Sequence, residues 1–380
     1  MKSLLTGLAV VFLLACCTSG QEPNTDLGNP EINAMLQKLI DDSRNSEDKK
    51  VTPIPGLVAG IISEDGKLEA GAAGIRKWGT EKFIQPTDLV HIGSCTKAMT
   101  ATLIGILVDE GKLSFDTTIA DGLPALKDSI HKDYLDVTLH QLLTHTSGVP
   151  RDGFWAAHMD KPVSERRKLI VEKALERKPK NKTGSKHEYS NLGYCIAGMI
   201  AAQSSDTTWE ELITKKLFTP LGMTSASFGP TDKTGNTEQP WGHLPLGKSP
   251  KPMNRDNPEA LGPAGTVHLT LEDWAKFAML HAGVSNQDLI KPETLEFLQQ
   301  VPNDHQKTSY ASGWIVHNRG WSKGKVLYHN GSNTFWFSVI WVAPKTKTAY
   351  FASANGGIAQ NVMIAVDQAI VGLIDWQSKN

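Results

Sequence analysis

A serine and a lysine three residues apart, Ser94 and Lys97, are the first pair in the sequence whose types and spacing suit chemistry. A serine hydroxyl is a weak nucleophile until a base removes its proton. On a helix, residues three apart lie on one face, so the Lys97 amine would reach the Ser94 hydroxyl. Burial of that helix would lower the lysine pKa and let the neutral amine act as the base. The pair therefore predicts a nucleophile, Ser94, that is activated by Lys97.

The spacing alone is weak evidence, because it recurs elsewhere in the chain, at Ser46/Lys49, Ser129/Lys132 and Ser322/Lys325. Context separates Ser94 from the others. It opens an apolar segment, 94–110, that Gly111 closes with a helix-stop signal. The segment is hydrophobic almost all round, which predicts a buried helix. At the start of that helix, backbone N–H groups and the positive dipole end would face a developing oxyanion. The structural alternative for Ser94 is a helix-capping residue.

Tyr189 and Asn191 form a second candidate motif, at the start of another helical segment that runs through Cys195. A tyrosine near a lysine can relay protons, and an amide can hold a substrate carbonyl. The alternative is a capped helix start with an aromatic ring packed on the core. Tyr328 and Asn330 share the same spacing, so this motif is also weak alone.

A third candidate is the run His329-Asn330-Gly331-Ser332, between a short strand and an aromatic-rich strand. Gly331 would let a substrate backbone approach closely. The N–H of Ser332 would then complete an oxyanion pair with the N–H of Ser94. The alternative is a simple turn, and the same His-x-Gly spacing occurs at 91–93 and 281–283.

Strand patterns lie near both ends of the chain, and helical patterns fill its middle. The predicted elements are a helix over 31–43, a hairpin over 56–74, helices within 138–209 and over 271–281, 292–299 and 359–375, and strands over 311–316, 334–342 and 348–354. This order predicts an α/β fold of the α+β type: an antiparallel sheet flanked by helices, with an inserted, mostly helical lobe. The sheet lobe would span about 31–90 and 264–380, and the helical lobe about 91–263.

A site between two such lobes is where ligand clefts usually lie. The segment 229–263 is dense in Pro, Gly, Asn and Lys, which predicts a long irregular loop. We expect this loop, with Trp241 and His243, to help form the wall of the cleft.

The N-terminal residues are predicted to direct export. Lys2 precedes an apolar run, 4–14, that is too short to span a bilayer, so residues 1–15 are predicted to be a signal peptide. The run ends in a lipobox-like sequence with Cys16 as the lipidated residue; ordinary secretion is the alternative. Residues 16–30 would form a flexible tether. The prediction is a cell-envelope lipoprotein facing the periplasm, or a secreted protein.

Composition narrows the partners. The 380 residues carry 39 Lys+Arg and 40 Asp+Glu, with a formal charge of −1 and no basic tract, which argues against nucleic acid. Membrane contact is predicted only through the N-terminal lipid, and a small-molecule or peptide substrate is expected. Cys95 and Cys195 are predicted to be buried thiols. No Cys/His cluster has zinc spacing, so no metal is predicted. The sequence leaves the oligomeric state open.

Taken in order along the chain, the three motifs resemble those of the class C β-lactamases and their relatives, the D-alanyl-D-alanine carboxypeptidases and β-lactamase-like esterases. Other stretches agree with that family, namely 111–116, 142–148, 218–223 and 262–265. The resemblance extends from about Pro55 to the C-terminal helix.

This resemblance implies a β-lactamase/transpeptidase-like fold, with 31–380 as one catalytic domain. It implies that Ser94 forms a covalent acyl-enzyme and that Lys97 and Tyr189 share the work of general base and proton relay. Substrate binding would fall to Asn191, His329, Gly331 and Ser332. The substrate would be an amide or ester, such as a D-amino-acid peptide, a β-lactam or a carboxylic ester, and no metal or organic cofactor is required.

One residue departs from the pattern of true β-lactamases, which usually carry lysine where this chain has His329. A histidine is only partly cationic near neutral pH, so it attracts a substrate carboxylate less. Peptidase or esterase activity therefore ranks above β-lactam hydrolysis. The alternative function is a non-catalytic or slow-turnover penicillin-binding or sensing lipoprotein.

Overall fold

The computed structural model describes residues 28–286, 288–302 and 309–380. The predicted signal peptide, Cys16 and all but the last residues of the predicted tether lie outside the described residues. Within the described ranges, no helix is both long enough and apolar enough to cross a membrane.

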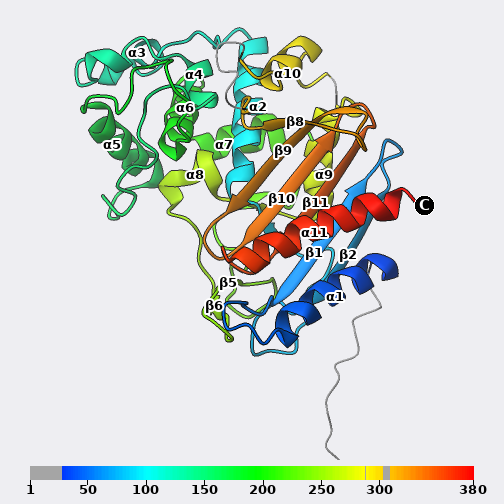
Figure 1. The fold of residues 1–380 in the computed structure, drawn as a ribbon. Helices are drawn as coiled ribbons and strands as arrows, with labels where there is room; N and C mark the ends of the chain where they lie inside the picture. The colour runs from blue at the N-terminus through cyan, green and yellow to red at the C-terminus, as the bar shows by residue number, and fades with distance from the viewer. Residues whose placement is uncertain (1–27, 287, 303–308) are drawn as a thin grey trace, which may run out of the picture.

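A six-stranded antiparallel sheet is built from both ends of the chain (Figure 1). Its strand order is β2-β1-β11-β10-β9-β8. The strands are β1 (Gly56–Ile62), β2 (Leu68–Gly74), β8 (Ile315–Arg319), β9 (Gly324–Ser332), β10 (Phe337–Ala343) and β11 (Thr348–Ala354). The N-terminal strand β1 pairs with the last strand, β11, with Leu57 opposite Ala354. The prediction of one antiparallel sheet assembled from the two ends is therefore confirmed.

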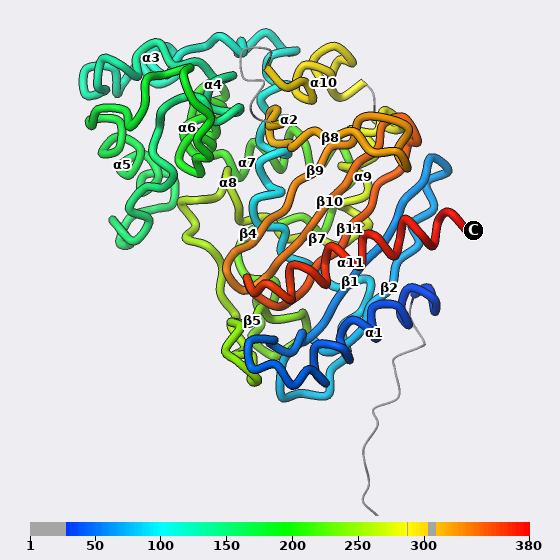
Figure 2. Tube along the Cα trace, viewed as in Figure 1, coloured from blue at the N-terminus to red at the C-terminus, as the bar shows by residue number. Residues whose placement is uncertain are grey.

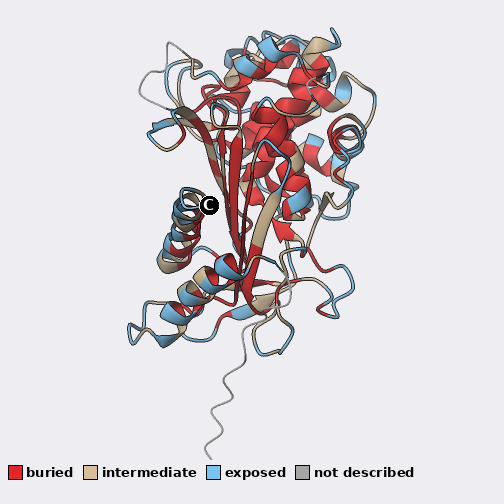
Figure 3. Ribbon diagram, turned by 90° about the vertical axis from the view of Figure 1, so that its right-hand side faces the viewer, coloured by how far each residue is buried: buried red, intermediate tan, exposed pale blue. Residues whose placement is uncertain are grey.

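Helices cover both faces of this sheet, as Figure 3 shows edge-on. On one face lie α1 (Pro30–Asn45) and α11 (Gln360–Gln377), which share an apolar cluster with the strands. The helical part packs on the other face around a second, larger cluster. Consecutive residues of β10 alternate between the two cores, Val339 in the first and Ile340 in the second. Because both faces are covered, β1 and β11 are buried along their whole length.

The helical part surrounds α2 (Thr96–Asp109), in which every residue from Thr96 to Leu107 is buried. This is the buried helix that the sequence predicted after Ser94. The other helices are α3 (Ile119–Gly122), α4 (Leu139–Leu143), α5 (Val163–Leu175), α6 (Asn191–Gln203), α7 (Trp209–Ile213), α8 (Gly262–Gly265), α9 (Leu271–His281) and α10 (Pro292–Leu298). Short helical turns lie at Gly93–Cys95, Pro124–Leu126, Lys132–Tyr134, Thr214–Phe218 and Glu259–Leu261. The predicted α+β class is confirmed.

The segment 229–263 is more ordered than the sequence predicted. It contains a small hairpin, β5 (Gly242–Leu244) with β6 (Lys251–Met253), toward the lower end of the molecule in Figure 2. A separate three-stranded sheet joins β3 (Val90–His91), β7 (Val267–Leu269) and β4 (Ser227–Phe228). Strands this short carry too little alternation to be recognised in a sequence.

The expected role of His243 in a cleft wall was wrong. Its side chain is buried, with Nε2 accepting from the amide of Trp78 and Nδ1 2.6 Å from the carbonyl of Asn355. Trp241 donates its Nε1–H to Asp232. The contact of Trp241 therefore lies within the segment 229–263, whereas the contacts of His243 join the segment to residues outside it.

Candidate active site

Ser94 lies in the short turn Gly93–Cys95, immediately before α2, and Lys97 lies in the first turn of that helix. The Lys97 side chain is completely buried, and its Nζ lies 3.1 Å from Oγ of Ser94. The structure thus brings the two residues together as their spacing predicted.

The Lys97 amine has three neighbouring acceptors. Besides Ser94, Nζ donates to Oδ1 of Asn191 at 2.8 Å and to the carbonyl of Ala264 at 2.7 Å. Burial lowers the pKa of Lys97 to about 7. A neutral amine keeps two N–H donors, enough for Asn191 and Ala264, and its lone pair can then face the Ser94 hydroxyl. This arrangement suits a general base.

Tyr189 packs against the same amine, with its ring centroid 4.8 Å from Nζ of Lys97. Burial raises the pKa of the phenol above its usual value, although a hydrogen bond with Ser94 opposes this shift. Tyr189 is therefore a protonated phenol at neutral pH, suited to passing a proton on rather than to acting as a phenolate.

The ring of His145 packs against the ring of Tyr189. His145 was not among the site residues that the sequence predicted. The two ring centroids lie 4.4 Å apart, and Nδ1 of His145 accepts from the amide of Ser190 at 3.1 Å. Burial, and next the nearby charge of Lys97, hold the pKa of His145 well below its usual value. The imidazole is therefore neutral.

His329 lies near the end of β9 and is almost fully buried, so this part of the chain is strand and not a simple turn. Its Nδ1 lies 2.5 Å from the carbonyl of Asn330, and its Nε2 lies 3.1 Å from the hydroxyl of Tyr310. Burial, and then the charge of Lys97, lower the pKa of His329 to about 3. The ring is therefore neutral near pH 7, with Nδ1–H donating to Asn330 and Nε2 accepting from Tyr310. Tyr310 was missed because it belongs to none of the three motifs.

Two glycines, Gly93 and Gly331, allow the backbone around Ser94 to pack closely against the backbone around Ser332. A β-carbon on Gly331 would lie 2.0 Å from the carbonyl oxygen of Ile92 and 2.5 Å from the amide nitrogen of Ser94. Gly93 has φ +49°, and a β-carbon there would lie 2.2 Å from the amide nitrogen of Ser332. Only glycine permits this close packing of the turn before Ser94 against the end of β9, so the oxyanion role of the two N–H groups stays a prediction.

Asn191 begins α6, where Ser190 caps the helix by accepting from the amide of Gly193. Its Nδ2 donates to Oδ1 of Asp152 at 2.8 Å while its Oδ1 accepts from Lys97. The second N–H of the Asn191 amide can still donate to a substrate. The contact of Asn191 with a substrate carbonyl stays a prediction. Asp152 was missed, because no motif of the sequence marks it.

The competing motif matches make other contacts. The Ser322 hydroxyl lies within hydrogen-bond distance of two backbone carbonyls, those of Arg319 and Gly324, and Lys325 donates to Gln299. Tyr328 accepts from the side chain of Asn330 on the same strand.

The described residues include no group of three or more His, Cys, Asp or Glu side chains placed to hold a metal ion. Cys95 and Cys195 are both buried and free, as the sequence predicted. Burial raises the pKa of each thiol, which leaves them unreactive.

Comparisons with known proteins show the family and the fold of the chain. In sequence, the chain is 26% identical to penicillin-binding protein 4 of Amycolatopsis lactamdurans, over 84% of this chain and 85% of that protein. It is also 26% identical to protein flp of Staphylococcus aureus strain N315, over 84% of this chain but only 64% of that protein.

Solved structures show the same fold. A class C β-lactamase from Rhodobacter sphaeroides matches with a TM-score of 0.71 and 19% identity, covering 91% of this chain and 99% of that one. The D-amino acid amidase from Ochrobactrum anthropi SV3 also gives a TM-score of 0.71 and 19% identity, covering 92% of this chain and 100% of that one. The family model for Beta-lactamase matches residues 44–368, well over half of the sequence. The chain therefore belongs to the beta-lactamase family.

Proposed function

We propose that this protein is a serine hydrolase in which an amide or ester substrate acylates Ser94 and water then releases the acyl group. The observation that carries the proposal is the buried amine of Lys97, 3.1 Å from Oγ of Ser94 and with a pKa lowered to about 7. A buried lysine that is largely neutral at physiological pH can accept the serine proton, which an exposed lysine cannot.

The reaction proceeds in two halves. The neutral Lys97 amine takes the hydroxyl proton as Oγ of Ser94 bonds to the substrate carbonyl carbon. The carbonyl oxygen becomes an anion between the N–H groups of Ser94 and Ser332, where each donor is worth roughly 3 kcal/mol. The proton passes through Tyr189 or directly from Lys97 to the leaving nitrogen or oxygen as that bond breaks. Water then attacks the acyl ester, its proton returns to Ser94, and the free acid departs.

The state of His329 supports a substrate that needs no fixed cation at the third motif. With its pKa near 3 and both ring nitrogens in contact with the chain, His329 offers no positive charge to a carboxylate. Carboxylic esters and small amides, including D-amino-acid derivatives, therefore rank above β-lactams as substrates. The amidase among the structural neighbours bears a name consistent with this ranking.

Covalent labelling tests the proposal. The wild-type protein is incubated with a fluorophosphonate probe and with a fluorescent penicillin, and the labelled peptide is identified by mass spectrometry. We expect the label on Ser94 and none on the Ser94→Ala variant. Ser322→Ala is the matched control, because Ser322 and Lys325 share the spacing of Ser94 and Lys97. Equal labelling of wild type and Ser94→Ala would overturn the assignment.

A kinetic panel then separates the enzyme from a binding protein. The substrates are p-nitrophenyl esters, a D-Ala-D-Ala peptide and a cephalosporin. We expect repeated turnover of an ester or amide and slower turnover of the cephalosporin. Stoichiometric acylation without release on every substrate would instead support the penicillin-binding or sensing alternative.

A further inference from the structure

The buried carboxylate of Asp256 lies at the junction of the two chain segments that carry the oxyanion donors. We propose that Asp256 is a positioning residue, which acts through His91 and Asn333 to hold the N–H groups of Ser94 and Ser332 in register. This inference rests on the proposed function, since it concerns the oxyanion site of that reaction. Asp256 belongs to the segment 229–263 and to none of the three motifs.

Asp256 and His91 form a close pair shielded from solvent. Oδ1 of Asp256 lies 2.6 Å from Nε2 of His91, with side-chain exposures of 5% and 0%. The two atoms are in close contact, but their geometry does not meet that of a hydrogen bond. Removing one member of so buried a pair would leave the other without its electrostatic partner.

His91 connects this carboxylate to the nucleophile turn. Its Nδ1 accepts from the amide of Gly93 at 3.1 Å, so Nδ1 acts as the acceptor and Nε2 is the ring nitrogen next to Asp256. Gly93 directly precedes Ser94 and holds the left-handed conformation that the turn requires. The carboxylate therefore selects the imidazole tautomer whose Nδ1 is free to hold this turn.

Asn333 connects the same carboxylate to the second donor. Its Nδ2 donates to Oδ1 of Asp256 at 3.2 Å, and its Oδ1 accepts from the amides of Phe335 and Trp336 at 3.1 and 3.0 Å. Asn333 directly follows Ser332, the last residue of β9, so these bonds fix the turn that follows the proposed second oxyanion N–H.

A third contact extends the unit toward the general base. The amide of Asn257 donates to Oδ1 of Asp256 at 2.6 Å, and the Asn257 side chain donates to the carbonyl of Gly265 at 2.7 Å. Gly265 follows Ala264, whose carbonyl accepts from Lys97. One carboxylate oxygen thus ties together the turn before Ser94, the turn after Ser332 and the end of α8.

These contacts affect the positions of the Ser94 and Ser332 backbones and not the charge that a substrate meets. Asp256 acts on Ser94 through the imidazole of His91 and the backbone of Gly93, and it acts on Ser332 through Asn333. Its loss should therefore weaken stabilisation of the tetrahedral oxyanion while leaving initial substrate binding unchanged.

The test compares Asp256→Ala with Asp232→Ala in the full chain. Asp232 is a matched control, because it is a buried carboxylate of the same segment that accepts from the amides of Thr234, Gly235 and Thr237 and from Trp241. The measurements are the acylation rate constant and the initial dissociation constant for a p-nitrophenyl ester. The inhibition constant of an aryl boronic acid is added, because its adduct with Ser94 is tetrahedral and anionic.

We expect Asp256→Ala to slow acylation and weaken boronate binding by about 10-fold each, less than the ~100-fold of a deleted donor. Initial ester binding should stay within about twofold. Asp256→Asn should recover most of the loss, because its amide oxygen can still accept from Asn257 and Asn333. The control should leave all three constants unchanged in the folded fraction.

Equal effects of Asp256→Ala and Asp232→Ala, or a loss confined to initial ester binding, would overturn the proposal. If Asp256→Ala fails to fold, the comparison moves to His91→Phe, which removes the acceptor for Gly93, and His91→Gln, which supplies one. Equal boronate affinity in these two variants would also overturn it. Failure of the proposed function itself looks different, because the wild-type protein would then show no acylation that depends on Ser94.

Discussion

Lys97 combines deep burial with two opposite charges on consecutive residues, Arg151 and Asp152. Burial is the largest cause of its lowered pKa; the carboxylate of Asp152 raises that pKa, and the guanidinium of Arg151 lowers it. The Nε atom of Arg151 lies 3.5 Å from Oδ2 of Asp152, and the two side chains are 68% and 41% exposed, respectively. Arg151 also lies over the ring of Tyr189, 5.4 Å from its centroid. The basicity of the amine is therefore tuned by residues that take no part in the bond changes.

The pH dependence of acylation should report this tuning. A base with a pKa of about 7 gives an acylation rate that rises with pH through 7 and then levels off. Asp152→Asn removes the charge that raises the pKa, so the rise should move to lower pH. Arg151→Gln removes the charge that lowers it, so the rise should move to higher pH.

Each of these shifts should be a few tenths of a pH unit, because both charges are partly exposed and screened by salt. Single-turnover acylation by an uncharged ester, measured from about pH 5 to 9 at low ionic strength, checks both. Shifts in the same direction, or none in either variant, would contradict the assignment of Lys97 as the base.

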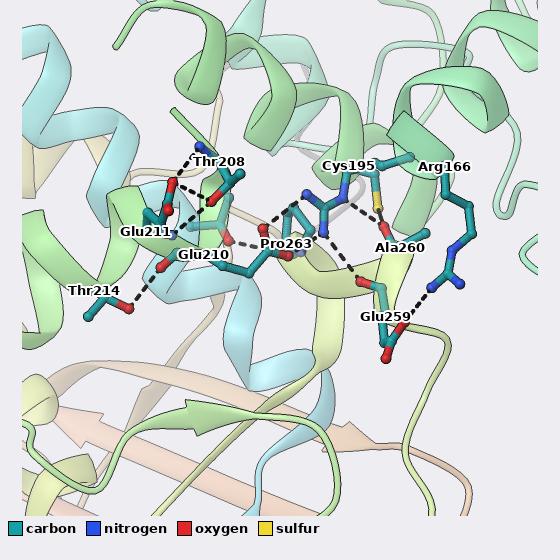
Figure 4. A network of polar contacts seen from close by, with 11 residues as sticks. Arg166, Cys195, Thr208, Glu210, Glu211, Thr214, Glu259, Ala260 and Pro263 are labelled. Carbon is teal, nitrogen blue, oxygen red and sulfur yellow. Dashed lines mark hydrogen bonds and ion pairs between the residues drawn. The ribbon is translucent and has the colours of Figure 1, made fainter. Parts of the chain in front are cut away.

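The four-residue helix α8 depends on α5, a helix distant in sequence, for its position. Its residues Pro263 and Ala264 supply the carbonyls that accept from Thr100 and Lys97 on α2. Four residues are too few to hold a helix by themselves. Arg167 of α5 binds the turn that leads into α8, with Nε donating to the carbonyl of Ala260 at 2.8 Å and Nη2 to that of Glu259 at 3.3 Å. Figure 4 labels Glu259 and Ala260 of this turn and Pro263 of α8.

Two consecutive arginines allow this support to be measured. Arg167 is 2% exposed and pairs with Glu210, whose side chain is 25% exposed, so Arg167→Met should lower the free energy of unfolding by about 3–5 kcal/mol. Arg166 is equally buried but pairs with Glu259, whose side chain is 67% exposed, so Arg166→Met should cost only about 1 kcal/mol. Denaturant unfolding of the two variants checks the difference. Losses of equal size would contradict a larger contribution from the contacts of Arg167 than from those of Arg166.

Element length also explains what the sequence could predict. The α2 helix, the β1–β2 hairpin and the C-terminal helix are long enough for composition and periodicity to reveal them. The hairpin β5–β6 has strands of three residues, one of them containing Pro252, and no pattern marked it.

The residues of the site also fall into two groups, those that the sequence could predict and those that it could not. Ser94 and Lys97 were recognisable because chemistry fixes their spacing on one helix. His145, Asp152, Asp256 and Tyr310 reach the site from three different connections between elements, and only tertiary packing brings them there. His91 was visible as a His-x-Gly match, but its partner lies 165 residues away in a segment that was expected to be irregular.

At the scale of the molecule, the sheet separates two apolar cores that have different consequences for function. The core shared with α1 and α11 lies on the face of the sheet away from the helical part (Figure 3). The core on the other face includes α2 and α6, which carry Lys97 and Asn191. The outer layer should therefore contribute stability without setting the geometry of the site.

Two leucines test this separation, because both are completely buried but in different cores. Leu36 lies on α1 in the outer core, and Leu192 follows Asn191 on α6. Each change to alanine should lower the free energy of unfolding by about 2–5 kcal/mol through lost contacts and a residual cavity. Leu36→Ala should leave the acylation rate constant of the folded protein unchanged, whereas Leu192→Ala should lower it severalfold, because the cavity lets Asn191 move relative to Lys97. The rate constant is measured by single turnover and normalised to the fraction of Ser94 that a fluorophosphonate can label. A comparable fall in Leu36→Ala would show that the outer helices do govern the site, and that the sheet transmits their packing to Ser94.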